Sequence, residues 1–253
     1  MISGDSDLSA IGALLSEPAR ALILLALNDG RALPASTLAS EAGVSPSTAS
    51  EHLRRLVAGG LITVTSHGRY RYYRLAGPQV ADLIEAVARL APARQVTSLR
   101  EGTKAQAIRL ARKCYDHIGG RLGVALADSF LERGYLTGHD GSVDFARMTG
   151  GRPAGGVLDP VAYTLTEQGA QAFRDLGAEP PRNRAVRCCV DWTEQRHHMA
   201  GAAGRELLRQ FLDDDWVRPS RHHRALTITE QGRERLAERF GILPDQLAAD
   251  RAA

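Results

Sequence analysis

Several classes of protein are excluded by what this sequence has little of. Its longest apolar run, from Ala21 to Leu27, is seven residues, and a membrane-spanning helix needs about 20. Three cysteines, an odd number, do not make a disulfide framework and favour a reducing cytoplasm. The opening MISGDSDLS has two acids and no apolar segment, so we expect no secretory signal. With 43% hydrophobic and 24% charged residues over 253 positions, the chain is expected to form one large globular domain or two ordinary ones.

The positive charge is concentrated in one short segment. Residues 45–75 contain five arginines and a single acid, Glu51, a net charge of +4, whereas the whole chain carries +3. A local excess of this kind is expected of a surface that meets phosphate groups, although a solvated charged face has the same composition. The motif around the arginines favours the first interpretation.

Two short helices joined by a tight turn are predicted around this segment. The first extends from Pro34 to Gly43, where glycine suits the end of a helix. Ser45 then caps a second helix, which begins at Pro46 and places Ala49, Leu53 and Leu56 on one face. This arrangement is a helix-turn-helix.

The opposite face of the second helix and the hairpin that follows carry groups suited to nucleic acid. Residues 61–76 alternate strand-forming residues around an expected turn at Ser66–Gly68, which predicts a β-hairpin, or wing. Hydroxyls near the helix start and longer donors behind them suit a recognition helix in a major groove. The candidate DNA-binding residues are Ser45, Ser47, Thr48, Ser50, Glu51, His52, Arg54, Arg55, His67, Arg69, Tyr70 and Arg71.

Three runs, EPARALILLALNDG, LASEAGVSPSTASEHLRRLVAGGLI and GRYRYYRLA, resemble the arsenical-resistance-repressor (ArsR) family of winged helix-turn-helix regulators. The resemblance implies a homodimeric repressor that binds an inverted repeat in double-stranded DNA and releases it when an effector binds. It implies dimerisation through helices near 8–15 and 78–90. The family's metal sensors have a cysteine pair before the recognition helix and histidine ligands on the last helix, and both are missing here.

The remainder of the chain contains an internal repeat. His117 recurs as His198, 81 residues later, and LTEQGAQAFRDLG recurs as ITEQGRERLAERFG. We expect a DNA-binding and dimerisation domain at 1–96 and an effector-sensing domain at 97–253, with repeats at about 107–178 and 188–242. Each repeat is predicted to contain a helix, a strand, a loop, a strand and a helix in that order. The first repeat has a long loop at Gly138–Pro160. The predicted fold class is mainly α with small β-hairpins (α+β), a winged helix-turn-helix followed by two winged-helix-like repeats.

Candidate effector-binding residues lie near the start of each repeat. Cys114 and His117 have a spacing of three, which predicts that they share one face of a helix, within a CYDH motif typical of a subset of the resembled family. A small organic ligand between the repeats is the favoured hypothesis, bound by Cys114, Tyr115, Asp116, His117, Asp191, Trp192, His197 and His198. The alternative is a soft-metal, arsenite or thiol-redox site at Cys114, Cys188 and Cys189, with or without the histidines. The cysteines also suit an ordinary core.

An enzyme is the alternative class of protein to a DNA-binding regulator. Some methyltransferases carry a winged helix for dimerisation, and their cofactor needs a glycine-rich turn directly after a strand. The glycine-rich stretch 149–156 follows no predicted strand. We therefore expect no catalytic residues and no cofactor. The expected protein is a cytoplasmic DNA-binding regulator with no membrane contact.

Overall fold

The structure, a computed structural model, describes residues 6–92, 98–138 and 163–248. The chain forms two compact units, 1–84 and 85–253. The division falls inside helix α5 (Pro78–Leu90), before the expected boundary at residue 96. The glycine-rich stretch 149–156 and all but the first residue of the expected long loop, Gly138–Pro160, lie outside the described residues.

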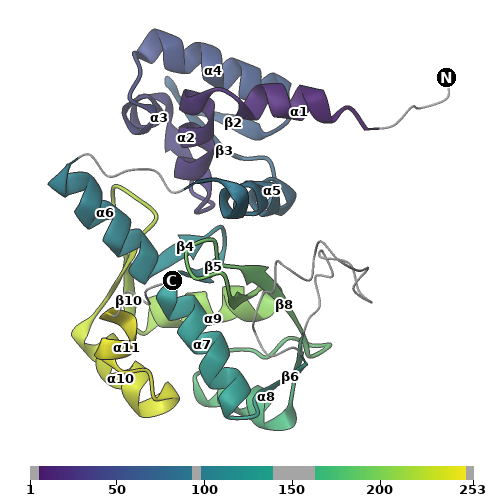
Figure 1. Ribbon diagram of the computed structural model, residues 1–253, viewed down its shortest axis with the longest axis vertical. Coiled ribbons are helices and arrows are strands. Elements are labelled where there is room, and N and C mark those ends of the chain that lie inside the picture. Colours follow the sequence, from purple (N-terminus) through teal and green to yellow (C-terminus); the bar gives the residue numbers. More distant parts are fainter. Residues whose placement is uncertain (1–5, 93–97, 139–162, 249–253) are drawn as a thin grey trace. The chain divides into compact units, whose positions relative to one another are not determined.

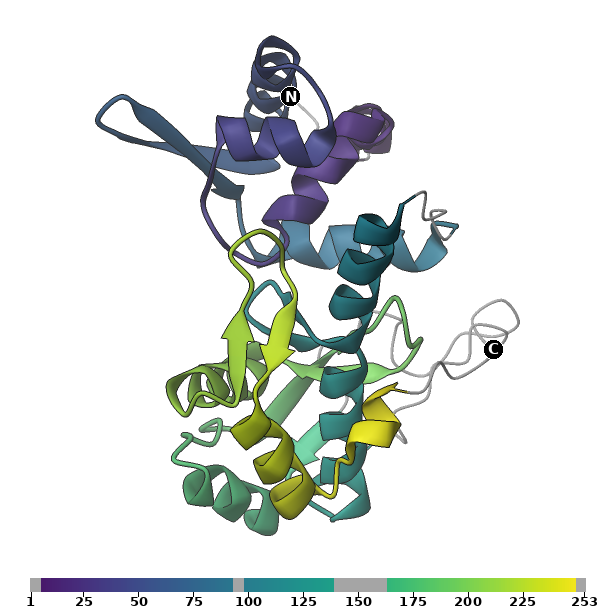
Figure 2. The same ribbon diagram turned by 90° about the vertical axis from the view of Figure 1, so that its left-hand side faces the viewer.

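The N-terminal unit is a winged helix-turn-helix (Figure 1). Its strands form an antiparallel sheet in the order β1-β3-β2. Figure 2 shows the hairpin of β2 and β3 extending away from the helices of the same unit. The elements are α1 (Leu8–Leu15), α2 (Pro18–Leu27), β1 (Leu33–Pro34), α3 (Ala35–Ala42), α4 (Pro46–Ala58), β2 (Ile62–His67) and β3 (Tyr70–Leu75), with α5 beginning after them.

Local sequence determines where the second helix of the motif begins. Gly43 ends α3 with φ of +67°, a conformation that glycine adopts without strain. The Ser45 hydroxyl accepts a hydrogen bond from the Thr48 backbone N–H at 3.2 Å, which caps α4, and Pro46 occupies its first turn. The apolar face predicted for this helix is confirmed, because Ala49, Leu53 and Leu56 are fully buried.

The C-terminal unit contains two repeats with the same order of elements. The first comprises β4 (Arg112–Cys114), β5 (His117–Gly119), α7 (Arg121–Glu132), β6 (Leu136–Gly138), β7 (Tyr163–Leu165) and α8 (Glu167–Asp175). The second comprises β8 (Ala185–Val190), β9 (His197–Ala200), α9 (Gly201–Asp213), β10 (Val217–Pro219), β11 (Leu226–Ile228) and α10 (Glu230–Phe240). Helix α6 (Leu99–Leu110) precedes them and α11 (Pro244–Ala248) follows. The predicted fold class is confirmed, and each winged-helix-like repeat gains a β-hairpin in front that we did not predict.

The two repeats exchange these leading hairpins. Strands β8 and β9 of the second repeat extend the wing of the first, giving a sheet in the order β6-β7-β8-β9. In return, β4 of the first repeat meets the wing of the second through an antiparallel bridge between Arg112 and Ala225. The Lys113 N–H donates to the Arg224 carbonyl at 2.8 Å in the same contact. Each hairpin therefore borders the wing of the other repeat.

Two equivalent glycines bring hairpins and helices together. A Cβ at Gly123 of α7 would lie 2.3 Å from the Ile118 carbonyl oxygen, and one at Gly204 of α9 would lie 2.2 Å from that of Met199. The same positions face the histidine of the other repeat, since a Cβ at Gly123 would be 3.3 Å from the His198 Cβ and one at Gly204 would be 2.8 Å from the His117 Cβ. Glycine thus allows both histidines to enter the space between the repeats.

One hydrophobic core joins both repeats of this unit. Phe130 stacks on Phe240 with 5.6 Å between ring centroids and meets Phe173 edge-on at 5.8 Å. No single helix among the described residues is long and apolar enough to cross a membrane, although α1 and α2, bent by 90° at their junction, pass that test as a pair by length and composition.

Candidate DNA-binding surface and candidate metal centre

Helix α4 presents two exposed arginines, each of which pairs with Glu51 through one of its nitrogens. The side chains of Arg54 and Arg55 are 75% and 60% exposed. Arg55 Nε donates to Glu51 Oε1 at 2.8 Å, and Arg54 pairs with the other carboxylate oxygen of Glu51. The Arg55 hydrogen bond lowers the pKa of the Glu51 carboxyl. DNA phosphates would therefore compete with Glu51 for both guanidinium groups.

The other predicted residues of α4 differ in how they face solvent. Ser47 and Thr48 are exposed at the helix start, where Ser45 Oγ lies 2.9 Å from Ser47 Oγ and 2.8 Å from Thr48 Oγ1. Ser50 is exposed, but its hydroxyl donates to the Pro46 carbonyl at 2.8 Å. His52 is half-buried, and its Nδ1 atom has no hydrogen-bond partner among the described residues. The first turn of α4 and its arginines are thus the accessible part of this surface.

The wing carries the second group of exposed residues. Every residue from Thr63 to Arg71 is exposed. Strand β2 continues through His67, which pairs with Tyr70, so the turn is Gly68–Arg69 and the expected turn at Ser66–Gly68 is corrected. Gly68 has φ of +60°, which suits this two-residue turn. Arg69 Nη2 donates to the Tyr70 hydroxyl at 2.9 Å, so the arginine is held at the tip.

The predicted helix around Cys114 and His117 is wrong, because both residues lie in a β-hairpin. Cys114 on β4 is directly opposite His117 on β5, and Tyr115 and Asp116 form the turn between them. Tyr115 has φ of 56°, as tight hairpin turns require. A spacing of three brings residues onto one helix face, and it also makes them cross-strand partners in a hairpin with a two-residue turn.

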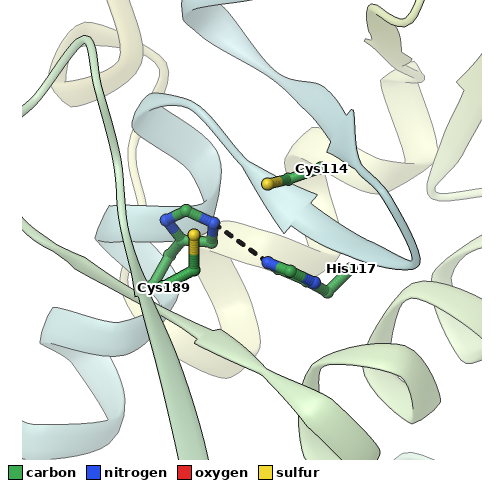
Figure 3. A group of neighbouring side chains, drawn as sticks. Cys114, His117 and Cys189 are labelled. Atoms are coloured by element: carbon green, nitrogen blue, oxygen red, sulfur yellow. Dashed lines mark hydrogen bonds between the residues drawn. The ribbon is translucent and has the colours of Figure 1, made fainter. Parts of the chain in front are cut away.

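The second repeat builds the same kind of pair, and the two pairs meet. Cys189 on β8 is directly opposite His198 on β9. The ligand atoms of Cys114, His117, Cys189 and His198 all lie within 4.8 Å of one another. The Nε2 atoms of the two histidines are 3.2 Å apart (Figure 3). Cys114 and both histidines are buried and Cys189 is half-buried. The structure therefore brings together a Cys2His2 cluster, with each repeat contributing one cysteine and one histidine.

Cys188 does not belong to this cluster. Neighbouring residues of a strand point to opposite faces, and Cys188 packs against the hydrophobic core. Burial raises the pKa of its thiol to about 12. The three-cysteine set of the alternative hypothesis is thus replaced by two cysteines and two histidines.

Each histidine of the cluster has a carboxylate behind it. Asp116 Oδ1 lies 3.1 Å from His117 Nδ1, and Asp191 Oδ2 lies 3.6 Å from His198 Nδ1. Burial lowers the pKa of His198. A hydrogen bond with Cys189, together with burial, raises the pKa of the Cys114 thiol. Burial alone would lower the pKa of His117 as well, but the neighbouring Cys114 and Asp116 raise it to about 10.

Asp191 also accepts hydrogen bonds from both repeats. Its Oδ2 atom accepts from Arg112 Nη2 at 2.8 Å and from the Gly120 backbone N–H at 2.6 Å. Its Oδ1 atom accepts from the backbone N–H groups of Thr193 and Glu194 at 2.9 and 3.2 Å. Burial alone would raise the pKa of Asp191, but the Arg112 guanidinium keeps it below its usual value. We did not single out Arg112 from the sequence.

Other candidate effector residues contact neighbouring side chains. The ring of Trp192 lies 5.0 Å from the Arg112 guanidinium, and the Tyr163 hydroxyl lies 2.8 Å from His197 Nδ1. Two surface hollows in the described part of this unit lie elsewhere, one beside Arg121 and Phe240 and the other beside Tyr135 and Leu176. Neither is lined by a candidate effector residue.

The fold and the exposed arginines define a DNA-binding protein of the winged helix-turn-helix class. A family model described as "Helix-turn-helix domain" matches residues 15–65. The transcriptional regulator YdfF of Bacillus subtilis is 39% identical over 232 residues, which cover 90% of this chain and 94% of YdfF. The chain therefore belongs to the family of helix-turn-helix (HTH-type) transcriptional regulators.

Shorter relatives match about a third of the chain. The regulator CmtR of Mycobacterium tuberculosis is 39% identical over 87 residues, covering 33% of this chain and 73% of CmtR. Among solved structures, reduced HlyU from Vibrio cholerae has 27% identity and a TM-score of 0.31, covering 34% of this chain and 88% of HlyU. The NMR structure of the cadmium metal-sensor CmtR from Mycobacterium tuberculosis has 32% identity and a TM-score of 0.27, covering 37% of this chain and 100% of CmtR.

Proposed function

We propose that this protein is a homodimeric, ArsR-type transcriptional repressor that acts in the cytoplasm. It binds an inverted repeat in double-stranded DNA with α4 and the β2–β3 wing, and the C-terminal unit receives the signal that releases it. The observation that carries the proposal is the exposure of basic side chains on both elements that a winged helix uses to contact DNA.

The geometry supports different DNA contacts for the helix and for the wing. Ser47, Thr48, Arg54 and Arg55 are exposed on α4, where side chains reach base edges in a major groove. Arg69 and Arg71 on the wing suit contacts with phosphate or with the minor groove. These six residues provide two hydroxyl groups and four positive charges. DNA binding does not require any of them to leave a buried partner.

Exposed apolar residues support a dimer through α1 and α5. Leu8 on α1 is 78% exposed, and Val87 and Leu90 on α5 are 44% and 81% exposed. Such side chains gain free energy when a second copy covers them. Ile84, in contrast, is buried within the single chain and does not contribute to this face.

A regulator also explains the second unit better than an enzyme does. Its buried polar residues are engaged with one another, as in the Arg112–Asp191 ion pair, and the relatives of the chain are transcriptional regulators. The expected organic ligand has little support, because Trp192 covers Arg112 and Asp191 accepts hydrogen bonds at both oxygens. The cluster of cysteines and histidines is the better candidate for an input site.

The proposal is tested with the full chain and a labelled duplex from the region upstream of its own gene. We expect fluorescence anisotropy to show binding that weakens steeply with salt, because arginines displace counterions from DNA. Arg55→Ala should weaken binding to this duplex by about 1–3 kcal/mol and relax its sequence preference. Arg71→Ala should weaken binding to this duplex and to a scrambled one alike.

Arg235→Ala is the matched control, since Arg235 is an exposed arginine of α10 in the other unit and its loss changes the net charge equally. It should leave the affinity nearly unchanged. Binding that is insensitive to salt, or Arg55→Ala and Arg235→Ala variants that behave alike, would contradict the proposed DNA surface.

A further inference from the structure

The spacing of the Cys114, His117, Cys189 and His198 ligand atoms already approaches that of a tetrahedral metal centre. Zinc binds histidine nitrogen at about 2.0–2.1 Å and cysteine sulfur at about 2.3 Å. Two nitrogens of one tetrahedron are then about 3.3 Å apart, and two sulfurs about 3.8 Å. The histidine Nε2 atoms are 3.2 Å apart, and all four ligand atoms lie within 4.8 Å of one another. The cluster needs to contract by only about an ångström to hold an ion.

The two histidines are also placed to share an ion. Asp116 Oδ1 lies 3.1 Å from Nδ1 of His117 and Asp191 Oδ2 lies 3.6 Å from Nδ1 of His198, so the Nε2 atoms are the nitrogens that face each other. When both rings are neutral with the proton on Nδ1, each Nε2 carries a lone pair. Two lone pairs facing each other at 3.2 Å repel unless a cation or a proton lies between them. A carboxylate behind a ligating histidine is the usual outer shell of a zinc site.

The charges around the cluster select a divalent ion. Arg112 already pairs with Asp191, and Arg205 Nε already donates to Asp116 at 2.9 Å, so neither carboxylate has to neutralise the ion. Two thiolates, from Cys114 and Cys189, balance a charge of +2. Trivalent arsenic forms three bonds to sulfur, and Cys188 lies outside the cluster. Two sulfur and two nitrogen ligands in a tetrahedron suit zinc.

We propose that Cys114, His117, Cys189 and His198 bind one zinc-class divalent ion, which joins the two repeats of the C-terminal unit. The thiols lose their protons to solvent when the ion binds. The four protein ligands fill the tetrahedron, so the ion has no open position for a substrate, as in structural zinc sites. The ligands come from both exchanged hairpins, and the ion therefore stabilises the contact between the repeats. This proposal concerns the C-terminal unit and does not depend on DNA binding.

The test is cobalt titration of the reduced, chelator-treated full chain. Cobalt(II) in a tetrahedral site with thiolate ligands gives intense visible bands, whereas octahedral cobalt is pale. We expect one cobalt per chain with the tetrahedral, thiolate-bound spectrum, and displacement by zinc. Cys188→Ser should bind as the wild type does, and Cys189→Ser, its neighbour on the same strand, should lose the spectrum.

Asp116→Asn gives a second variant that spares all four ligands. Its side chain is 30% exposed, so folding should tolerate the change, and cobalt affinity should fall by about 10–100-fold. Chelation should lower the urea midpoint of the wild type and Cys188→Ser but not that of Cys189→Ser, as followed by tryptophan fluorescence. A wild type that gives only pale, octahedral cobalt, or equal affinities for the Cys188→Ser and Cys189→Ser variants, would overturn the proposal.

Discussion

Replacing Arg112 by methionine should destabilise the C-terminal unit by about 3–5 kcal/mol. The Arg112 and Asp191 side chains are both 0% exposed and their charged atoms are 2.8 Å apart. Methionine fills a similar volume but removes the positive charge, and the Asp191 carboxylate is then buried without its ion-pair partner. Asp191→Asn alone should also destabilise the unit, because the buried guanidinium then keeps only the more distant Glu85, whose Oε2 atom lies 4.0 Å from Arg112 Nη2.

The double variant Arg112→Met/Asp191→Asn distinguishes the ion pair from simple packing. With both charges removed, the buried carboxylate that remains beside this position, Glu85, still pairs with Arg224 at 3.1 Å. The remaining cost is the weakened hydrogen bond from the Gly120 N–H, about 1–3 kcal/mol. We therefore expect the double variant to lose far less than the sum of the two single losses.

The chain offers a convenient assay, because its two tryptophans, Trp192 and Trp216, both belong to the C-terminal unit. Urea unfolding followed by tryptophan fluorescence thus reports this unit, at a fixed metal content. Arg209→Met is the control, since Arg209 is an exposed arginine in surface ion pairs and its loss should leave the urea midpoint nearly unchanged. Single losses that add within about 0.5 kcal/mol in the double variant would refute the reasoning.

Three further predictions concern the N-terminal unit and α5. Val87→Asp places a charge on an exposed apolar face and should convert the dimer to monomers in light scattering, whereas Gln79→Asp, at an exposed polar position of α5, should not; a Val87→Asp dimer would place the contact elsewhere. Ser45→Ala removes the cap of α4 and should cost about 1 kcal/mol in thermal unfolding followed by circular dichroism. Ser45→Asp should keep that stability and lose DNA affinity through repulsion of phosphate; retained affinity would exclude phosphate near the cap. Glu51→Gln frees two arginines and should strengthen DNA binding several-fold at low salt, with a smaller gain at high salt; weaker binding would indicate that the Glu51 carboxylate contacts a base.

The winged helix-turn-helix was predictable because its signals are local. Gly43, Ser45 and Pro46 mark the end of one helix and the start of the next, and alternating strand formers mark the wing. The repeat was predictable from its 81-residue offset, since His117 and His198 do meet. Both signals can be read without knowing which segments lie together in space.

The cluster was only partly predictable because its signals are ambiguous or non-local. The spacing of Cys114 and His117 fits a helix face and a hairpin pair equally well, and nothing between them distinguishes the two. Strand alternation would have separated Cys188 from Cys189 had a strand been assigned there. Arg112 gave no signal, because its partner Asp191 belongs to the other repeat.

The exchanged hairpins have a consequence for synthesis of the protein on the ribosome. Strand β4 opens the first repeat, yet its neighbour in the second wing, at Ala225, is made only late in the second repeat. Until β8 and β9 are made, the first repeat also lacks its sheet partner and half of the Cys2His2 cluster, and strand edges without partners promote aggregation. The C-terminal unit must therefore complete its folding after nearly all of it has left the ribosome. A gene fragment that stops after the first repeat is therefore expected to yield aggregated protein.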